Sequence, residues 1–193
     1  MRKMVEYVVL ASLAHESRSG YDVTKWLTSV ASHFWPVVHS GIYPALAALE
    51  SDGLVRHETV TSEHGPARKV YSLTMRGQQD LLAWVDSPAP TAQVRDEQLV
   101  RALCYGYLPP ELALARLAQV RQAHIARLAH YEALQREIMG VDAAGKDEVG
   151  VADSAQLGKL LVVRRGILSE QGYLHWCEEA ALLIEALRRS SGV

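Results

Sequence analysis

The sequence is poor in the features that build disulfide-bonded or membrane-spanning proteins. Its 193 residues include two cysteines, too few for a disulfide framework, and we expect Cys104 and Cys177 to be small buried hydrophobic residues. No apolar run approaches the roughly 20 residues that span a bilayer, so no membrane partner is expected. The N-terminal apolar run meets His15 and Glu16 at once. This favours a first helix over a secretory signal, and a cytoplasmic protein.

The sequence also lacks an excess of charge of either sign. Twenty Lys and Arg stand against 22 Asp and Glu, a formal net charge of −2. Nucleic-acid-binding modules usually carry a basic excess, so the total argues against DNA. That argument is weak, because residues 54–76 hold four basic side chains against two acidic ones. A near-neutral total predicts modest, salt-sensitive affinity per subunit.

Catalytic and metal-binding motifs are missing from the sequence as well. It contains no G-x-S-x-G, no Walker loop and no H-E-x-x-H. His124 and His130 are six residues apart, which puts them on different faces of a helix and makes them a poor metal pair. We therefore expect no enzyme activity, no cofactor and no metal.

Residues 1–87 begin with helix signals. Ser19 and Asp22 have the spacing of a capping box before the apolar residues of a second helix. A third helix is predicted to begin near Ser40, and Gly53 is placed to end it.

The sequence pattern then changes from one typical of helices to one typical of strands. Residues 54–61 are rich in Val and Thr, residues 62–66 form a turn, and 69–73 supply the return strand. Thr74 is placed to cap a fourth helix. Three helices, a two-stranded hairpin and a helix are the order of a winged helix-turn-helix. We therefore expect a mainly α protein with this domain at its N-terminus.

Residues 88–193 are predicted to form an all-helical domain after a proline-containing connector. One long helix runs from Pro110 to about Met139, and the last from about Ser154 to Arg188. The last helix has one apolar stripe at a and d positions, interrupted by Glu170: Leu160, Val163, Ile167, Leu174, Cys177, Ala181 and Ile184. A second stripe lies beside it: Leu157, Leu161, Leu168, Leu183 and Leu187. A helix apolar on two sides needs more cover than one intramolecular partner supplies, so we expect a homodimer through this helix.

The third helix would supply the element that reads DNA. A recognition helix presents its N-terminal residues to the major groove, and its free N–H groups attract phosphate. Ser40, Gly41 and Tyr43 lie at this end. The alternative is that Ser40 only caps the helix and that Tyr43 packs in the core.

The hairpin would supply the second contact with DNA. His64, Gly65, Arg68 and Lys69 form a short basic wing that can reach phosphates or the minor groove. The alternative is an ordinary solvated hairpin.

Three stretches resemble the PadR family of bacterial transcriptional regulators: SGYDV (19–23), HFWPVVHSGIYPALAALESDGLV (33–55) and GPARKVYSLTMRGQQDLLAWV (65–85). The resemblance covers residues 4–87 by motif. The remainder is similar by architecture to the subgroup with an extended C-terminal helical domain. The resemblance implies a homodimer that binds promoter DNA, usually as a repressor. It also implies, in many members, release when a small aromatic effector binds.

The resemblance also implies which residues contact DNA: Tyr21, Ser40, Gly41 and Tyr43 from the helices, and Gly65, Arg68 and Lys69 from the wing. His39, directly before Ser40, and His64 at the hairpin tip complete the candidate DNA-binding residues. The sequence departs from the family pattern at two places. Ser19 stands where a histidine usually precedes the Gly-Tyr pair, and Ala47 and Ala48 stand where many relatives carry Arg or Lys. Fewer phosphate contacts predict weaker non-specific binding and a shallower salt dependence.

Aromatic and hydrogen-bonding residues of the second half are candidates for an effector site: His124, Tyr131, His175 and Trp176. His124 and Tyr131 are seven residues apart and therefore share a helix face. The alternative is that all four are core or dimer-interface residues. The function predicted is a dimeric, sequence-specific DNA-binding regulator of a near-palindromic promoter site. The alternative function is a winged-helix adaptor for protein–protein contact.

Overall fold

The computed structural model describes residues 2–30, 41–62, 65–89, 95–140 and 153–190. The chain divides into two compact units, Met1–Thr91 and Ala92–Val193. The sequence analysis placed this boundary at residue 87.

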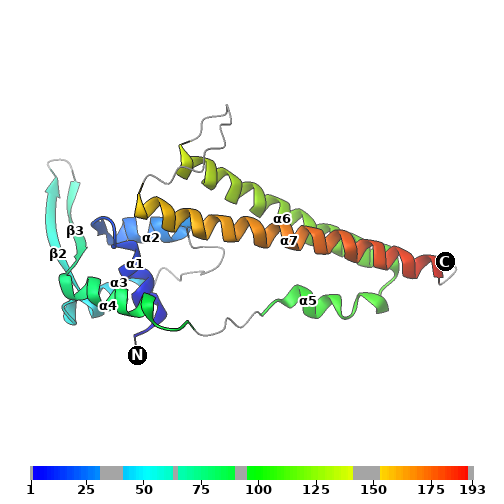
Figure 1. The fold of residues 1–193 in the computed structure, drawn as a ribbon, viewed down its shortest axis with the longest axis horizontal. Coiled ribbons are helices and arrows are strands. Elements are labelled where there is room, and N and C mark those ends of the chain that lie inside the picture. Colours follow the sequence, from blue (N-terminus) through cyan, green and yellow to red (C-terminus); the bar gives the residue numbers. More distant parts are fainter. Residues whose placement is uncertain (1, 31–40, 63–64, 90–94, 141–152, 191–193) are drawn as a thin grey trace. The chain divides into compact units, whose positions relative to one another are not determined.

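The first unit is a small helical bundle with an antiparallel sheet. Its elements are α1 (Met4–Ser12), β1 (Arg18–Ser19), α2 (Gly20–Val30), α3 (Ile42–Ser51), β2 (Val55–Ser62), β3 (Gly65–Leu73) and α4 (Met75–Asp86) (Figure 1). This is the element order of the predicted winged helix-turn-helix.

The sheet has one strand more than the predicted hairpin. Its strand order is β1-β3-β2, with Arg18 opposite Tyr71 and Ser19 opposite Val70. A two-residue strand is too short to show a period of two, so the sequence pattern did not reveal β1. Because β1 leads directly into α2, it ties the start of that helix to the wing strand β3.

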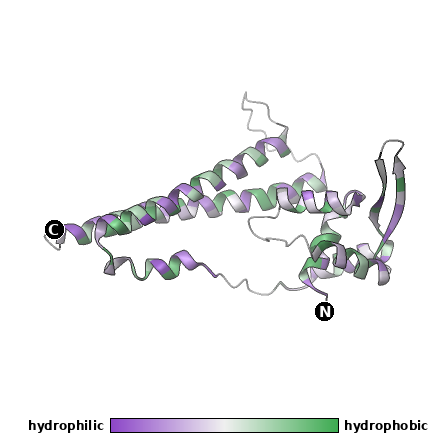
Figure 2. Ribbon diagram, turned by 180° about the vertical axis from the view of Figure 1, so that it is seen from behind, coloured by the Kyte–Doolittle hydropathy of each residue, from purple (hydrophilic) through white to green (hydrophobic). Residues whose placement is uncertain are grey.

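The core of the first unit lies where α1, α2 and α3 meet. In Figure 2, hydrophobic and hydrophilic residues alternate along the helices, as expected of helices that bury one face. Its fully buried large side chains come from these helices and from the start of β2: Val9, Leu10, Val23, Leu27, Ile42, Leu46, Leu49, Leu54 and Val55. Burying each of them contributes about 1.5–3 kcal/mol relative to an exposed side chain.

The predicted end signals of these helices are confirmed. The Ser19 hydroxyl accepts a hydrogen bond from the Asp22 N–H at 3.2 Å, and the Asp22 carboxylate accepts one from the Ser19 N–H at 3.3 Å, which is a capping box. Gly53 follows α3 with a positive φ of 70°, a conformation that favours glycine at a helix end. The Thr74 hydroxyl accepts a hydrogen bond from the Gly77 N–H and caps α4.

The described part of the second unit contains helices only. Its elements are α5 (Glu97–Ala102), the short 3₁₀ helix η2 (Tyr105–Tyr107), α6 (Pro110–Met139) and α7 (Ser154–Ser190). The long helices α6 and α7 lie antiparallel and side by side (Figure 1). Within the residues that the structure describes, none of the helices is long and apolar enough to cross a membrane.

The two apolar stripes predicted for α7 have different surroundings. Leu160, Val163 and Cys177 from the a and d stripe are buried. In the second stripe, Leu161 is 63% exposed and Leu183 is 72% exposed. The second stripe therefore has no cover within the described chain.

The expectation for the cysteines is half right. Cys177 is buried, whereas Cys104 is exposed. Cys104 lies in the short connection between α5 and η2, where little packs over it. Neither α5 nor η2 was predicted, because helices of six and three residues are too short to show a helical period.

Candidate DNA-binding surface and effector cavity

The starts of α2 and α3 meet at the surface of the first unit. Tyr21 is 70% exposed and Tyr43 is 59% exposed, so Tyr43 does not pack in the core. The Tyr43 ring lies over Gly20, where an added Cβ would stand only 2.6 Å from the ring atom Cε1. Gly20, the first residue of α2, therefore lets the Tyr43 ring lie against it, next to Tyr21.

The exposed side of α3 carries no basic side chain near its start. Ala47 and Ala48 are both exposed, as a recognition-helix surface requires. The attraction for phosphate on this helix comes from its free N–H groups and dipole, and the charged contacts have to come from other elements.

The wing supplies such charges close to α2. Arg68 and Lys69 are exposed on β3, opposite Val60 and Thr59 of β2. Successive residues of a strand point to opposite faces, so these two basic side chains diverge.

Arg68 lies on the α2 side of the wing. The hydrogen bond from the Ser19 hydroxyl lowers the pKa of Asp22, and the charge of Arg68 adds to this effect. Since Asp22 belongs to the capping box of α2, Arg68 stands near the N-terminus of that helix.

Three of the expected DNA-contacting residues lie outside the described residues: His39, Ser40 and His64. Gly41 directly precedes α3, and Gly65 begins β3. The structure thus brings together Tyr21, Gly41 and Tyr43 at the helix starts.

The four effector candidates lie in different environments along α6 and α7. His124 is buried and donates from Nδ1 to Glu170 Oε2 at 2.5 Å. The same carboxylate oxygen accepts a bond from Arg127 Nε at 3.3 Å. The ring of His124 stacks on Tyr173 with centroids 3.6 Å apart. Glu170, the interruption of the apolar stripe, is therefore a paired charge between α6 and α7.

The other three candidates have different environments. Tyr131 is buried against Gly166, and burial raises the pKa of its hydroxyl. The side chain of His175 is 73% exposed. Trp176 meets Tyr173 edge-on at 5.1 Å between centroids.

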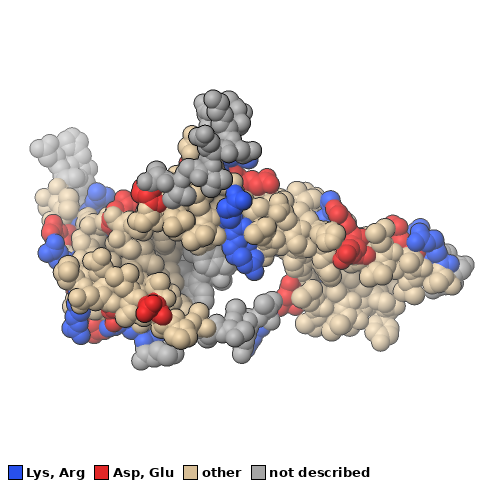
Figure 3. Space-filling view, viewed as in Figure 1, with Lys and Arg blue, Asp and Glu red and all other residues tan. Residues whose placement is uncertain are grey.

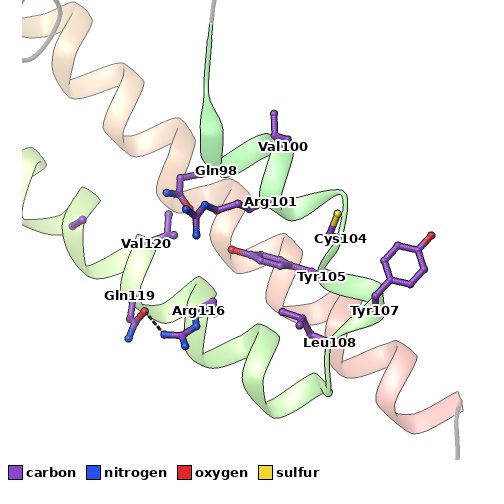
Figure 4. Close-up of a pocket in the computed structure, with 11 residues that line it drawn as sticks. Gln98, Val100, Arg101, Cys104, Tyr105, Tyr107, Leu108, Arg116, Gln119 and Val120 are labelled. Carbon is purple, nitrogen blue, oxygen red and sulfur yellow. Dashed lines mark hydrogen bonds between the residues drawn. The ribbon is translucent and has the colours of Figure 1, made fainter.

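A cavity of about 720 Å³ lies between α5, η2 and α6. Figure 4 shows Arg101 and Tyr105 reaching from α5 and η2 toward α6, while Tyr107 points away. Gln98 and Arg116 add polar groups, and the remaining lining is largely apolar. Arg101 Nε donates to the Glu97 carboxylate at 2.9 Å, so part of its charge is already neutralised, whereas Arg116 donates to the neutral side chain of Gln119 at 3.1 Å. Arg116 therefore offers the stronger positive charge, beside apolar surface that suits a planar anion.

Tyr105 of the cavity wall stands near a group of aromatic residues of the helical pair, His124, Tyr173 and Trp176. Burial raises the pKa of Tyr173, with further contributions from Asp96 and from Tyr105 of the cavity wall. Tyr173 in turn contacts both His124 and Trp176. The sequence analysis missed Arg101, because α5, which carries it, is too short to give a periodic signal.

Comparison with known protein families divides the chain in the same way. Residues 9–83 match the transcriptional regulator PadR-like family. Residues 94–185 match the family described as virulence activator alpha C-term.

Two curated relatives match nearly the whole chain. A probable transcriptional regulator of Mycobacterium tuberculosis, Rv1176c, is 26% identical, over 94% of this chain and 98% of the relative. The negative transcriptional regulator PadR of Bacillus subtilis is also 26% identical, over 95% of this chain and 98% of the relative. Both are regulators rather than enzymes, as predicted for this chain.

Solved structures share the fold. Bacillus subtilis PadR in complex with operator DNA superposes with a TM-score of 0.81 at 24% identity, over 94% of this chain and 99% of that one. The Vibrio cholerae virulence activator AphA superposes with a TM-score of 0.68 at 26% identity, over 95% and 99% of the two chains. The winged helix followed by long helices is the architecture that these regulators share, and the chain is a transcriptional regulator of the PadR type.

Proposed function

We propose that the protein is a dimeric, sequence-specific DNA-binding repressor. Residues 1–87 would bind promoter DNA, and residues 88–193 would dimerise and hold an effector. The relative from Bacillus subtilis is named a negative transcriptional regulator, and its structure has been solved with operator DNA. These names support the proposal for this chain.

The observation that carries the proposal is the exposure of Tyr43 and Tyr21 together at the starts of α3 and α2. Exposed tyrosines offer a hydroxyl donor and a planar ring, both suited to phosphate and base edges. The nearby Arg68 adds a charge that can pair with the backbone. In this proposal His39, Ser40, Gly41, His64, Gly65 and Lys69 complete the contact.

Two copies would bind two half-sites of a near-palindrome. The recognition helices of such dimers lie about one helical turn, roughly 34 Å, apart. The exposed leucine stripe of α7 supports dimerisation. Each subunit alone would bind its DNA half-site with modest affinity, because its basic surface is small.

A small planar anion would act as the effector that releases DNA. Bacillus subtilis PadR has been solved in complex with p-coumaric acid, an acid of this class. In this chain the cavity beside Arg101 and Tyr105 has the volume and the polarity for such a ligand. Of the four candidates named from the sequence, His124 and Trp176 would lie near this cavity, because both contact Tyr173. Tyr131 and His175 would lie outside it. Ligand binding would shift the population toward dimers with a spacing that DNA does not accept.

A gel-shift assay with the protein's own upstream DNA tests the DNA-binding proposal. Tyr43→Ala should weaken binding about tenfold, because it removes a contact worth about 1–3 kcal/mol at the helix start. Arg68→Ala should weaken binding and reduce the salt slope by about 2, since each of the two subunits loses one phosphate contact.

Arg189→Ala is the matched control, because Arg189 is an exposed basic residue of the helical unit. If neither Tyr43→Ala nor Arg68→Ala differs from this control, the adaptor alternative is favoured.

A further inference from the structure

The proposed recognition helix α3 has one buried face and one exposed face with few hydrogen-bonding side chains. The buried residues are Ile42, Ala45, Leu46 and Leu49. The exposed residues are Tyr43, Pro44, Ala47, Ala48 and Ser51, which share one side of the helix. Among these exposed residues, the tyrosine in the first turn and the serine at the end have a side chain that can donate or accept a hydrogen bond. We call Pro44, Ala47 and Ala48, which lie between them, the apolar patch of α3.

The two carboxylates at the end of α3 already have partners within the first unit. Glu50 is half-buried, and its carboxylate accepts a hydrogen bond from His57 Nδ1 of β2. Asp52 directly follows the helix and accepts a hydrogen bond from Arg2 Nη1 at 2.7 Å. A cation beside each carboxylate reduces its repulsion of DNA phosphates. The charged groups of this region therefore allow the apolar patch to approach DNA without contacting the bases themselves.

The charged side chains of the first unit do not form one broad basic surface. Figure 3 shows its basic and acidic side chains in small separate groups on the visible face. The basic residues of the wing, Arg68 and Lys69, belong to β3 rather than to α3. Contacts between such residues and phosphates position a protein on DNA but do not read the sequence directly. For α3, direct reading of bases therefore depends on Tyr43 and the apolar patch.

The major groove offers a single apolar group on the edges of the bases. Thymine presents its C5-methyl group, whereas the remaining groups are N–H donors or nitrogen and oxygen acceptors. An alanine methyl pressed against a donor or an acceptor would remove water from it without replacing the lost hydrogen bond, which weakens binding. Against a thymine methyl group, the same side chain buries apolar surface on both partners. Each methyl group buried in this way strengthens binding about fourfold.

We propose that the apolar patch of α3 reads thymine, with Ala47 and Ala48 packed against thymine C5-methyl groups in the major groove of each half-site. This inference rests on the proposed DNA-binding function and specifies the base that the middle of α3 selects. Because alanine side chains are short, the helix can approach the base edges closely. Ala47 and Ala48 are thus specificity-determining residues, while Tyr43 and the wing hold the helix in place.

Replacing thymine by uracil in the DNA tests this assignment, because uracil keeps every base pair and lacks only the methyl group. The protein's own upstream DNA, made with deoxyuridine in place of all thymidine, is compared with the ordinary duplex in a gel-shift titration. The parent protein should bind the uracil duplex at least about tenfold more weakly, since methyl contacts are lost in both half-sites. Equal binding to the two duplexes would overturn the proposal.

Ala47→Gly/Ala48→Gly removes the methyl groups on the protein side. Both positions are exposed, so the fold should persist, which a melting curve verifies. This variant should bind the thymine duplex about as weakly as the parent binds the uracil duplex. Uracil should then weaken its binding by less than about threefold, because the two changes remove the same contacts. If uracil weakened the variant as strongly as the parent, the methyl groups would act through DNA shape, and the assignment would be wrong.

Ala83→Gly is the matched control, because Ala83 is an exposed residue of α4 in the same unit. It makes the same change in a helix that is not proposed to read bases. This variant should keep the parent's affinity and its tenfold sensitivity to uracil. Loss of that sensitivity would show that glycine acts through the stability of the unit, which contradicts a direct contact.

5-Methylcytosine separates the methyl group from the base pair that carries it. At a thymine whose single replacement by uracil weakens binding, the DNA is remade with cytosine or with 5-methylcytosine in both half-sites. The 5-methylcytosine duplex should bind about tenfold more tightly than the cytosine duplex, because it restores one methyl group in each half-site. Equal binding of the two would contradict the methyl contact.

Binding to the ordinary duplex separates this inference from the function on which it rests. A parent protein that binds neither the thymine nor the uracil duplex contradicts the proposed function, and the reading of thymine with it. A parent protein that binds both equally well contradicts only the reading of thymine by α3.

Discussion

At the scale of single residues, Gly20 determines how the start of α3 presents its tyrosine. The Tyr43 ring occupies the space that a side chain at position 20 would need. The ring is more than half exposed, so it can move away at small cost to the fold. Gly20 is thus a positioning residue for a contact that Tyr43 would make.

Gly20→Ala should weaken operator binding about as much as Tyr43→Ala, roughly tenfold, with the thermal midpoint nearly unchanged. The added methyl group displaces the Tyr43 ring rather than disrupting the core. A gel-shift titration with a parallel melting curve measures both quantities. The double variant Gly20→Ala/Tyr43→Ala should bind no more weakly than Tyr43→Ala alone. A further loss would mean that Gly20 acts through another residue.

At the scale of elements, α2 depends on its capping box for the stability of its first turn. The hydrogen bond from the Ser19 hydroxyl to the Asp22 carboxylate, 2.6 Å long, lowers the pKa of Asp22 below its usual value of 3.8. A carboxyl with a lowered pKa stabilises the folded state at a pH above its unfolded value. That contribution is lost as the pH falls through the folded value.

Asp22→Asn should therefore lower the free energy of unfolding by about 1 kcal/mol at pH 7, and by progressively less as the pH falls below 4. Urea denaturation at pH 7, 5 and 3 measures the difference from the parent. In a Ser19→Ala background the same substitution should have little effect, because the bond that lowers the pKa is already gone. A constant difference at all three pH values would contradict the role of this carboxyl.

The elements also show how far a sequence pattern reaches. The capping box at Ser19, the glycine that ends α3 and the cap at Thr74 were predicted, because each depends on a few adjacent residues. The strand β1, the helix α5 and η2 were missed, because they are shorter than the periods that identify a strand or a helix.

The candidate site divides along the same line. Tyr43 and Arg68 each belong to a motif that lies within a single element, α3 and β3 respectively, and both are exposed in the structure. The cavity beside Arg101 depends on how α5 packs on α6, which is a long-range arrangement with no local signal. The interior partner of Glu170 also belongs to another helix. Its interruption of the stripe was visible in the sequence, but its pairing with His124 was not.

At the scale of the whole molecule, the proposed function requires that dimerisation and DNA binding be linked. A winged helix with a small basic surface binds DNA more tightly when dimerisation holds a second winged helix at the correct spacing. Once the first winged helix is bound, binding of the second is effectively intramolecular. The exposed leucine stripe of α7 would then set the affinity for DNA without contacting DNA. A change in this stripe should alter operator binding and its salt dependence together.

Leu161→Glu/Leu183→Glu places carboxylates in both halves of the exposed leucine stripe of α7. Since both leucines are mostly exposed, the fold of the monomer should persist, which circular dichroism verifies. Operator affinity should fall about 100-fold, since avidity is lost. The slope of log affinity against log salt should fall to about half, because only one subunit's phosphate contacts remain. Leu82→Glu, at an exposed position of α4, is the control and should retain dimerisation. If the double variant became monomeric and still bound the full operator with the parent's affinity and salt slope, each subunit would read DNA independently. The leucine row on α7 would then serve assembly alone.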